Sequence, residues 1–181
     1  PWLAGVCFGV ATIKPQFGIL VPVVLLATGE WRVIAAAALT ATLLGLAATL
    51  AFGSQVWSDW MAISHAAQSA LEQGAVGFGK MQSPFAAARL LGASVVSAYA
   101  LQAVVGVAVA AALVWAGWRR RYSLALGAAM LAGAPLATPF VLDYDLALIA
   151  FPLIWLAGAD FRPWEKLIAA LAFAVALFAR P

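Results

Sequence analysis

The stretch that decides the fold runs from Val33 to Phe52 and reads VIAAAALTATLLGLAATLAF, without a single charge. As an α-helix these residues extend about 30 Å, which matches the hydrocarbon core of a bilayer. The whole chain has this character, because 66% of its 181 residues are hydrophobic and only 9% are charged. Soluble domains carry about 25% charged residues. The composition excludes a soluble or disordered chain and predicts an all-α, polytopic transmembrane helical bundle.

Charge-free stretches predict about five to six spans. Besides the span at 33–52, we expect spans at Ser94–Trp118, Tyr122–Thr138, Phe140–Ala159 and from Leu167 onward. The first segment, Trp2–Gly29, is too long for one upright span and contains Lys14-Pro15-Gln16 near its middle. Proline removes a backbone donor and disfavours helix at the preceding residue. We therefore expect two helical arms that meet at a break, either in a kinked span or in a re-entrant hairpin.

Residues 53–93 form a long loop with helical patterning. Apolar and aromatic side chains recur at helical spacing, at Trp57, Trp60, Met61, Ser64, Ala67 and Leu71. This pattern predicts an amphipathic helix lying in the membrane interface, with the two tryptophans as anchors. Ser83-Pro84 then predicts an N-cap and first-turn proline for a short helix ending near Leu91.

The basic residues predict the orientation. Loops 30–32, 119–121 and 160–166 hold six Lys and Arg, whereas loops 53–93 and 139–145 hold two, Lys80 and Arg89. The positive-inside rule places the first set in the cytoplasm and the second set outside it. We expect an integral protein of a bacterial-type inner or plasma membrane.

Several classes of site are not supported by the sequence. One Cys7 and one His65 give neither a disulfide nor a metal-ligand set, so we expect no metal and no cofactor. The net charge of +3 comes from ten Lys and Arg, three of them clustered at 119–121, which indicates topology rather than nucleic-acid binding. The chain starts at Pro1 without Met and ends in an apolar run. We therefore expect one integral-membrane domain, 1–181, that is a fragment lacking N-terminal spans and the extreme C-terminus.

Lys14 is the strongest candidate for a functional residue. An ionisable side chain in hydrocarbon costs roughly 2.5–3.5 kcal/mol on insertion scales. A lysine beside a helix break indicates a cation that faces a polar cavity and binds an anion such as a lipid phosphate. The alternatives are a lysine that extends to the interface or pairs with a carboxylate in the bundle.

Asp143-Tyr144-Asp145 is the second candidate. Two acids at a helix start are either a binding element or simple complements of the helix dipole. In a regular helix residues two apart point about 200° from each other, so at most one would face a cavity. Lys80 either clamps an anionic headgroup or is solvated, while Arg89 and His65 are expected at the interface and in solvent.

Three stretches resemble a known family. They are GVATIKPQFGIL at 9–20, with GEWR at 29–32; KMQSPFAAARLLG at 80–92; and ATPFVLDYDL at 137–146. In this order and spacing they resemble glycosyltransferase family 87, polytopic enzymes of GT-C architecture. The resemblance implies transfer of a sugar, often mannose, from a polyprenyl-phosphate-linked donor to a lipid or glycan acceptor on the extracytoplasmic face.

The resemblance also implies roles for individual residues. Lys14, Gln16 and Lys80 would bind the donor phosphate, and Asp143 or Asp145 could accept the proton of the acceptor hydroxyl. Enzymes of this architecture carry their catalytic acid in the first outer loop, which would precede Pro1. The two aspartates would then position substrate, and the fragment alone would be inactive. The competing hypotheses are a transporter or flippase fragment with a broken helix at Lys14-Pro15, and a non-catalytic membrane scaffold.

Overall fold

A computed structural model describes residues 1–120, 123–158 and 162–178, and the described residues are helical apart from turns and one isolated β-bridge. The α-helices are α1 (Trp2–Val10), α2 (Leu20–Thr28), α3 (Trp31–Phe52), α4 (Gln55–Gln73), α5 (Pro84–Leu90), α6 (Val95–Arg120), α7 (Leu124–Ala137), α8 (Ala150–Ala157) and α9 (Pro163–Phe178). Short 3₁₀ turns are η1 (Ala11–Ile13), η2 (Pro15–Phe17), η3 (Phe78–Lys80) and η4 (Asp143–Ile149).

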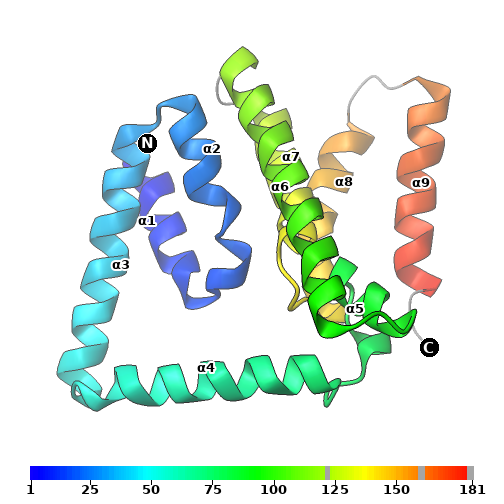
Figure 1. Ribbon diagram of the computed structural model, residues 1–181. Helices are drawn as coiled ribbons and strands as arrows, with labels where there is room; N and C mark the ends of the chain where they lie inside the picture. The colour runs from blue at the N-terminus through cyan, green and yellow to red at the C-terminus, as the bar shows by residue number, and fades with distance from the viewer. Residues whose placement is uncertain (121–122, 159–161, 179–181) are drawn as a thin grey trace.

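Helices α3, α6, α7, α8 and α9 run along one common direction, up and down in turn (Figure 1). The turns at residues 29–32 and near Arg119 lie at one end, which we call the arginine end. Residues 53–93 and 138–145 lie at the opposite end, the loop end. Of the described helices, α3 and α6 are long and apolar enough to cross a bilayer alone. The expected five to six spans therefore stay a prediction.

The first two helices form a helical hairpin. Gly5 of α1 meets Ala36 of α3, and one turn later Gly9 meets Thr40, with no room for a Cβ at either glycine. Both pairs advance in the same direction, so α1 lies parallel to α3. Helix α2 follows α1 in the chain and runs back in the opposite direction, so the hairpin turns partway along α3 (Figure 1). The predicted break at Lys14-Pro15 is confirmed, and the packing decides that it is a hairpin rather than a kink.

The loop end contains the predicted helix over 55–73. Helix α4 runs across the bundle axis and is connected to the end of α3 (Figure 1). Trp57 Nε1 donates to Thr49 Oγ1 at 2.9 Å, which ties the two helices at their corner. The predicted N-cap is also confirmed, because the Ser83 hydroxyl accepts from the Ala86 N–H at 3.2 Å at the start of α5.

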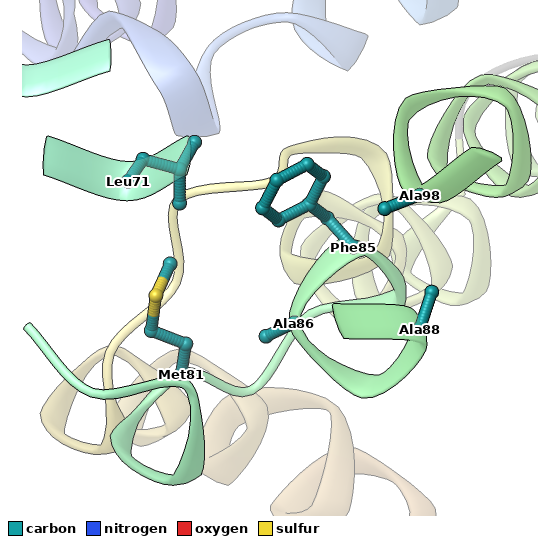
Figure 2. Packing of buried hydrophobic residues seen from close by; sticks show 6 residues of the cluster. All are labelled: Leu71, Met81, Phe85, Ala86, Ala88 and Ala98. Carbon is teal, nitrogen blue, oxygen red and sulfur yellow. The ribbon is translucent and has the colours of Figure 1, made fainter. Parts of the chain in front are cut away.

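Two apolar clusters hold the helices together. At the loop end, Figure 2 shows the fully buried Phe85 ring between Leu71 of α4 and Ala98 of α6, with Met81 alongside. Nearer the arginine end, α2, α6 and α7 share a second cluster of Leu20, Val24, Leu113, Leu126 and Met130. The first cluster anchors the long loop onto the bundle, and the second joins the hairpin to α6 and α7.

The helix expected from Phe140 to Ala159 begins later and differently. Residues 138–142 are extended or irregular, η4 starts at Asp143, and the α-helical part is α8, Ala150–Ala157. The main chain of this segment pairs with another segment rather than within a helix, since the Val141 carbonyl accepts from the Gln82 N–H at 2.9 Å. The predicted start at Phe140 is therefore wrong. Helix α9 begins at Pro163 rather than Leu167, because the Glu165 carboxylate accepts from the Arg162 N–H at 2.8 Å.

Candidate functional site

Lys14 lies at the tip of the α1–α2 hairpin, between η1 and η2. Pro15 lacks an N–H, and the backbone at Lys14 leaves the helical region, with φ −121° and ψ 73°. The Lys14 ammonium contacts Asp145 Oδ1 at 2.5 Å and lies over the rings of Phe17 and Tyr144, 5.3 and 4.9 Å from their centroids. Nearly half of the lysine side chain, 49%, remains exposed. The ammonium therefore keeps a donor direction for a ligand.

Asp145 is the buried partner in this pair. Its side chain is 4% exposed, its Oδ1 faces Lys14, and its Oδ2 accepts from the Leu142 N–H at 3.0 Å. Both carboxylate oxygens are thus engaged, one by a charge and one by the main chain. Asp145 holds Lys14 in place and fixes the start of η4, which suits a positioning residue.

Asp143 has a different environment, although it is only two residues away. Its side chain is exposed, and its Oδ1 accepts from the Tyr144 N–H at 2.8 Å. Only one of the two acids lines the cavity beside Lys14, and that acid is Asp145. The Asp143 side chain is open to solvent.

The three sequence stretches that carry the resemblance come together here. Met81 and Leu142 form an antiparallel bridge, supported by the hydrogen bond between Gln82 and Val141. This bridge joins stretch 80–92 to stretch 137–146, and the pair of Lys14 with Asp145 joins stretch 9–20 to the same segment. Residues far apart in the chain therefore build one site.

A cavity of about 570 Å³ opens beside the pair. Lys14, Tyr144 and Asp145 lie at its polar end. The rest of its lining is apolar or glycine, from Phe8, Ala11, Ile13, Phe17, Gly18, Val21, Met130, Leu131, Ala134, Ala147, Leu148 and Phe151. A pocket of this size and lining is typical of small-molecule and cofactor sites.

The other sequence candidates lie around this centre. Gln16 is half-buried in η2, two residues from Lys14. Lys80 is exposed at the end of η3, next to the Met81 bridge. His65 is exposed on α4, as expected.

Arg89 packs between α4 and α5 through its guanidinium. Its guanidinium donates to the carbonyls of Ala93 at 2.7 Å and Glu72 at 3.3 Å, and lies over the Phe78 ring. This arginine clamps the end of α4 against α5. Its role is structural.

Sequence reasoning missed Gln102, the buried amide of α6. Its Oε1 accepts from the Phe85 N–H at 3.2 Å, and its Nε2 donates to the Leu136 carbonyl at 2.8 Å. It thereby satisfies main-chain groups at the start of α5 and the end of α7. A single amide in a long apolar helix was the signal that could have revealed it.

The site offers one ammonium, one engaged carboxylate and two aromatic rings. Within residues 1–120, 123–158 and 162–178, no three His, Cys, Asp or Glu side chains come together as metal ligands. An ammonium beside an apolar cavity can bind a phosphate and stabilise negative charge that develops on it.

Comparison with known proteins adds one finding. The family model described as glycosyltransferase family 87 matches residues 1–142. This range includes Lys14, Lys80 and both residues of the bridge between Met81 and Leu142. No curated protein and no solved structure matches the chain.

Proposed function

Because the chain belongs to glycosyltransferase family 87, a family of membrane glycosyltransferases, we propose that it acts on a polyprenyl-phosphate-linked sugar. The sugar we propose is mannose, and the acceptor is a lipid or glycan hydroxyl. Transfer takes place at the loop end, which we place on the extracytoplasmic face because the opposite end carries the arginine cluster.

One observation supports this proposal above the others. Lys14, whose side chain is about half exposed, lines a mainly apolar cavity, so charge and hydrocarbon surface are offered side by side. A lipid phosphate has the matching form, with an anionic head and an apolar tail. Soluble sugar nucleotides lack the tail.

The proposed step breaks the bond between sugar C1 and the phosphate oxygen and forms a bond between C1 and the acceptor oxygen. The polyprenyl phosphate leaves with the electron pair, and the hydroxyl proton passes to a carboxylate. Lys14 stabilises the charge growing on the phosphate, with Gln16 and Lys80 as further phosphate-binding residues. Asp145 positions Lys14 through their ion pair.

Asp143 is the more accessible candidate for contact with the acceptor, because its side chain is exposed. In this proposal Asp143 orients the acceptor hydroxyl. The alternative of a transporter or flippase rests on the broken helix alone, and the family match favours the transferase.

The test uses membranes that contain the full-length protein, supplied with radiolabelled polyprenyl-phosphate mannose or with a mannose nucleotide. We expect transfer from the lipid-linked donor only. Lys14→Ala should lower kcat/KM about 10²–10³-fold, the usual loss when one oxyanion-stabilising group is removed. The matched control is Lys166→Ala on α9, an exposed lysine at the arginine end, which should leave the rate unchanged.

Membrane abundance of each variant is measured in parallel to separate insertion from catalysis. Full turnover by a well-inserted Lys14→Ala protein would overturn the role of Lys14. Transfer from the nucleotide sugar without any lipid-linked donor would overturn the donor class.

A further inference from the structure

Gln102 is a buried amide in a mainly apolar helix, and both of its polar atoms are bonded to main-chain groups of other elements. The residue is 5% exposed, and α6 is long and apolar enough to cross a bilayer. Burying an amide is costly unless its hydrogen bonds are made. Here Oε1 accepts from the Phe85 N–H at 3.2 Å, and Nε2 donates to the Leu136 carbonyl at 2.8 Å. A side-chain amide supplies this combination of one acceptor and one donor.

The two main-chain groups lie at helix ends, where a helix leaves donors and acceptors without internal partners. Phe85 is the second residue of α5, so its N–H has no carbonyl of its own helix to reach. Leu136 is the next-to-last residue of α7, and the donor three positions on would be Pro139, which has no N–H. The N–H four positions on, that of Phe140, donates to the Thr138 hydroxyl at 3.4 Å. The amide therefore completes the ends of two helices.

Both helix ends lead directly into the candidate site. The bridge between Met81 and Leu142 lies a few residues from each of the two bonded positions, Phe85 and Leu136. This bridge is isolated, so it belongs to no longer ladder that would fix its alignment. Gln102 holds the two segments from their far ends and thereby keeps the bridged residues opposite each other.

The bridge is in turn connected to the cation of the site. The Leu142 N–H donates to Asp145 Oδ2 at 3.0 Å, and the Asp145 N–H donates to the Leu142 carbonyl at 3.0 Å. The other oxygen of this carboxylate is the partner of Lys14. Lys80 immediately precedes Met81 on the opposite side of the bridge. A shift of Leu142 would therefore move the carboxylate that holds the ammonium.

From this arrangement we propose that Gln102 is a positioning residue for sugar transfer. It keeps the ends of α5 and α7 in register, so that the bridge sets Asp145 and, through Asp145, Lys14. Gln102 does not line the cavity beside Lys14. The inference rests on the proposed function and adds a residue that acts on the site from within α6. The alternative is an amide that only stabilises the packing of the helices.

The alignment of the bridge is measured by disulfide formation. Met81→Cys and Leu142→Cys are introduced together into the full-length protein in membranes, with Cys7→Ala. Facing residues of an antiparallel pair have Cα atoms about 4.5–5.5 Å apart, which a disulfide can span. Mass spectrometry of the linked peptide gives the rate of closure under mild oxidation. Gln102→Met should slow closure about fivefold, because the two thiols meet less often when their segments are no longer held. Leu101→Met, at an exposed neighbouring position, should leave the rate unchanged.

Transfer from the lipid-linked donor is measured in the same proteins, with the paired-cysteine parent as reference. With the thiols reduced, Gln102→Met should lower kcat about tenfold, less than the roughly 10²-fold that a misplacement of 1 Å can cost. Closing the disulfide should restore most of kcat, because a covalent bond then aligns the bridge, and reduction should remove the gain. An amide that only stabilises packing would change membrane abundance and leave the kcat of the inserted protein unaltered.

An unchanged closure rate in Gln102→Met would overturn the inference, as would a closed disulfide that leaves the lowered kcat unrestored. Gln102→Asn provides the same two measurements when Gln102→Met fails to accumulate. Slower closure is expected there as well, because the shorter amide cannot reach both main-chain groups. Absence of transfer by the wild-type protein defeats the proposed function instead, and the closure rate still decides whether Gln102 aligns the bridge.

Discussion

Lys14 and Arg89 are both cations near the loop end, yet their surroundings differ in kind. The Arg89 guanidinium donates to two main-chain carbonyls and lies against Phe78. The Lys14 ammonium contacts a single carboxylate, keeps half of its side chain exposed and faces a cavity. Around Arg89 the protein has filled the space, and around Lys14 it has left room.

This difference separates structural cations from binding ones. Two of the Arg89 nitrogens donate to backbone carbonyls, which stabilises the fold, while its buried Nε has no hydrogen-bond partner among the described residues. A cation held by one buried carboxylate is fixed in position while still exposing donors. Both side chains are cationic, so their hydrogen-bond partners and the free volume around them are what distinguish the two.

The largest expected effect tests how much the packed cluster around Phe85 contributes to stability. Phe85→Ala removes a fully buried ring from the loop-end cluster, where it also lies 4.7 Å from the Tyr99 ring. The cavity left behind should lower the free energy of unfolding by about 3–5 kcal/mol. Unfolding in mixed micelles with increasing SDS measures it. Phe151→Ala, at an exposed position lining the cavity beside Lys14, is the control. An equal loss of unfolding free energy there would mean that the loop-end cluster is no better packed than the cavity wall.

The next effect concerns Asp145 as the residue that positions Lys14. Asp145→Ala should lower transfer about 10²-fold, because a misplaced catalytic group can cost that much. Asp143→Ala should lower it less. If Lys14 and Asp145 act as one unit, the double variant Lys14→Ala with Asp145→Ala is no slower than Lys14→Ala alone. Additive losses in kcat/KM would contradict this coupling.

A smaller effect tests the clamp at Arg89. Arg89→Lys keeps the charge but loses the fork that reaches the carbonyls of Glu72 and Ala93. We expect a loss of about 2 kcal/mol in unfolding free energy, in the range of one hydrogen bond to a charged group. The donor KM should stay constant. A raised KM at normal stability would place Arg89 in the binding site, and Arg32→Lys at the exposed start of α3 serves as control.

The smallest effect concerns the N-cap of α5. Ser83→Ala removes the hydroxyl that accepts from Ala86 and should cost about 1 kcal/mol of stability. Ser58→Ala is the control, because that hydroxyl is exposed and bonds only within its own helix. The SDS midpoint measures both variants. Equal midpoints would mean that the cap contributes nothing to anchoring the loop.

Short-range features of this fold follow from the sequence. The uncharged run at 33–52 makes a helix because a helix satisfies its interior backbone N–H and C=O groups within the segment itself. Pro15 breaks the first segment since it lacks a donor, and Ser83-Pro84 starts α5 through a local cap. In each case the deciding contacts lie within about one helical turn, so the pattern alone is sufficient.

The error at Phe140 shows where that reasoning fails. Pro139 and the two acids after it suggested an immediate helix start. Residues 141 and 142 instead pair with residues 81–82, which precede α6 in the chain. A partner some 60 positions away cannot be read from local pattern. Gln102 was missed for the same reason, because its two hydrogen bonds reach α5 and α7.

The sequence by itself determined the helical membrane character, the break at Lys14 and the residue types available for chemistry, since these depend on composition and nearest neighbours. Only the tertiary structure decided that the break is a hairpin, through the close contact of Gly5 and Gly9 with α3. It also selected Asp145 over Asp143 as the partner of Lys14, 131 positions away. Such choices depend on which helices pack together and on the space left between them.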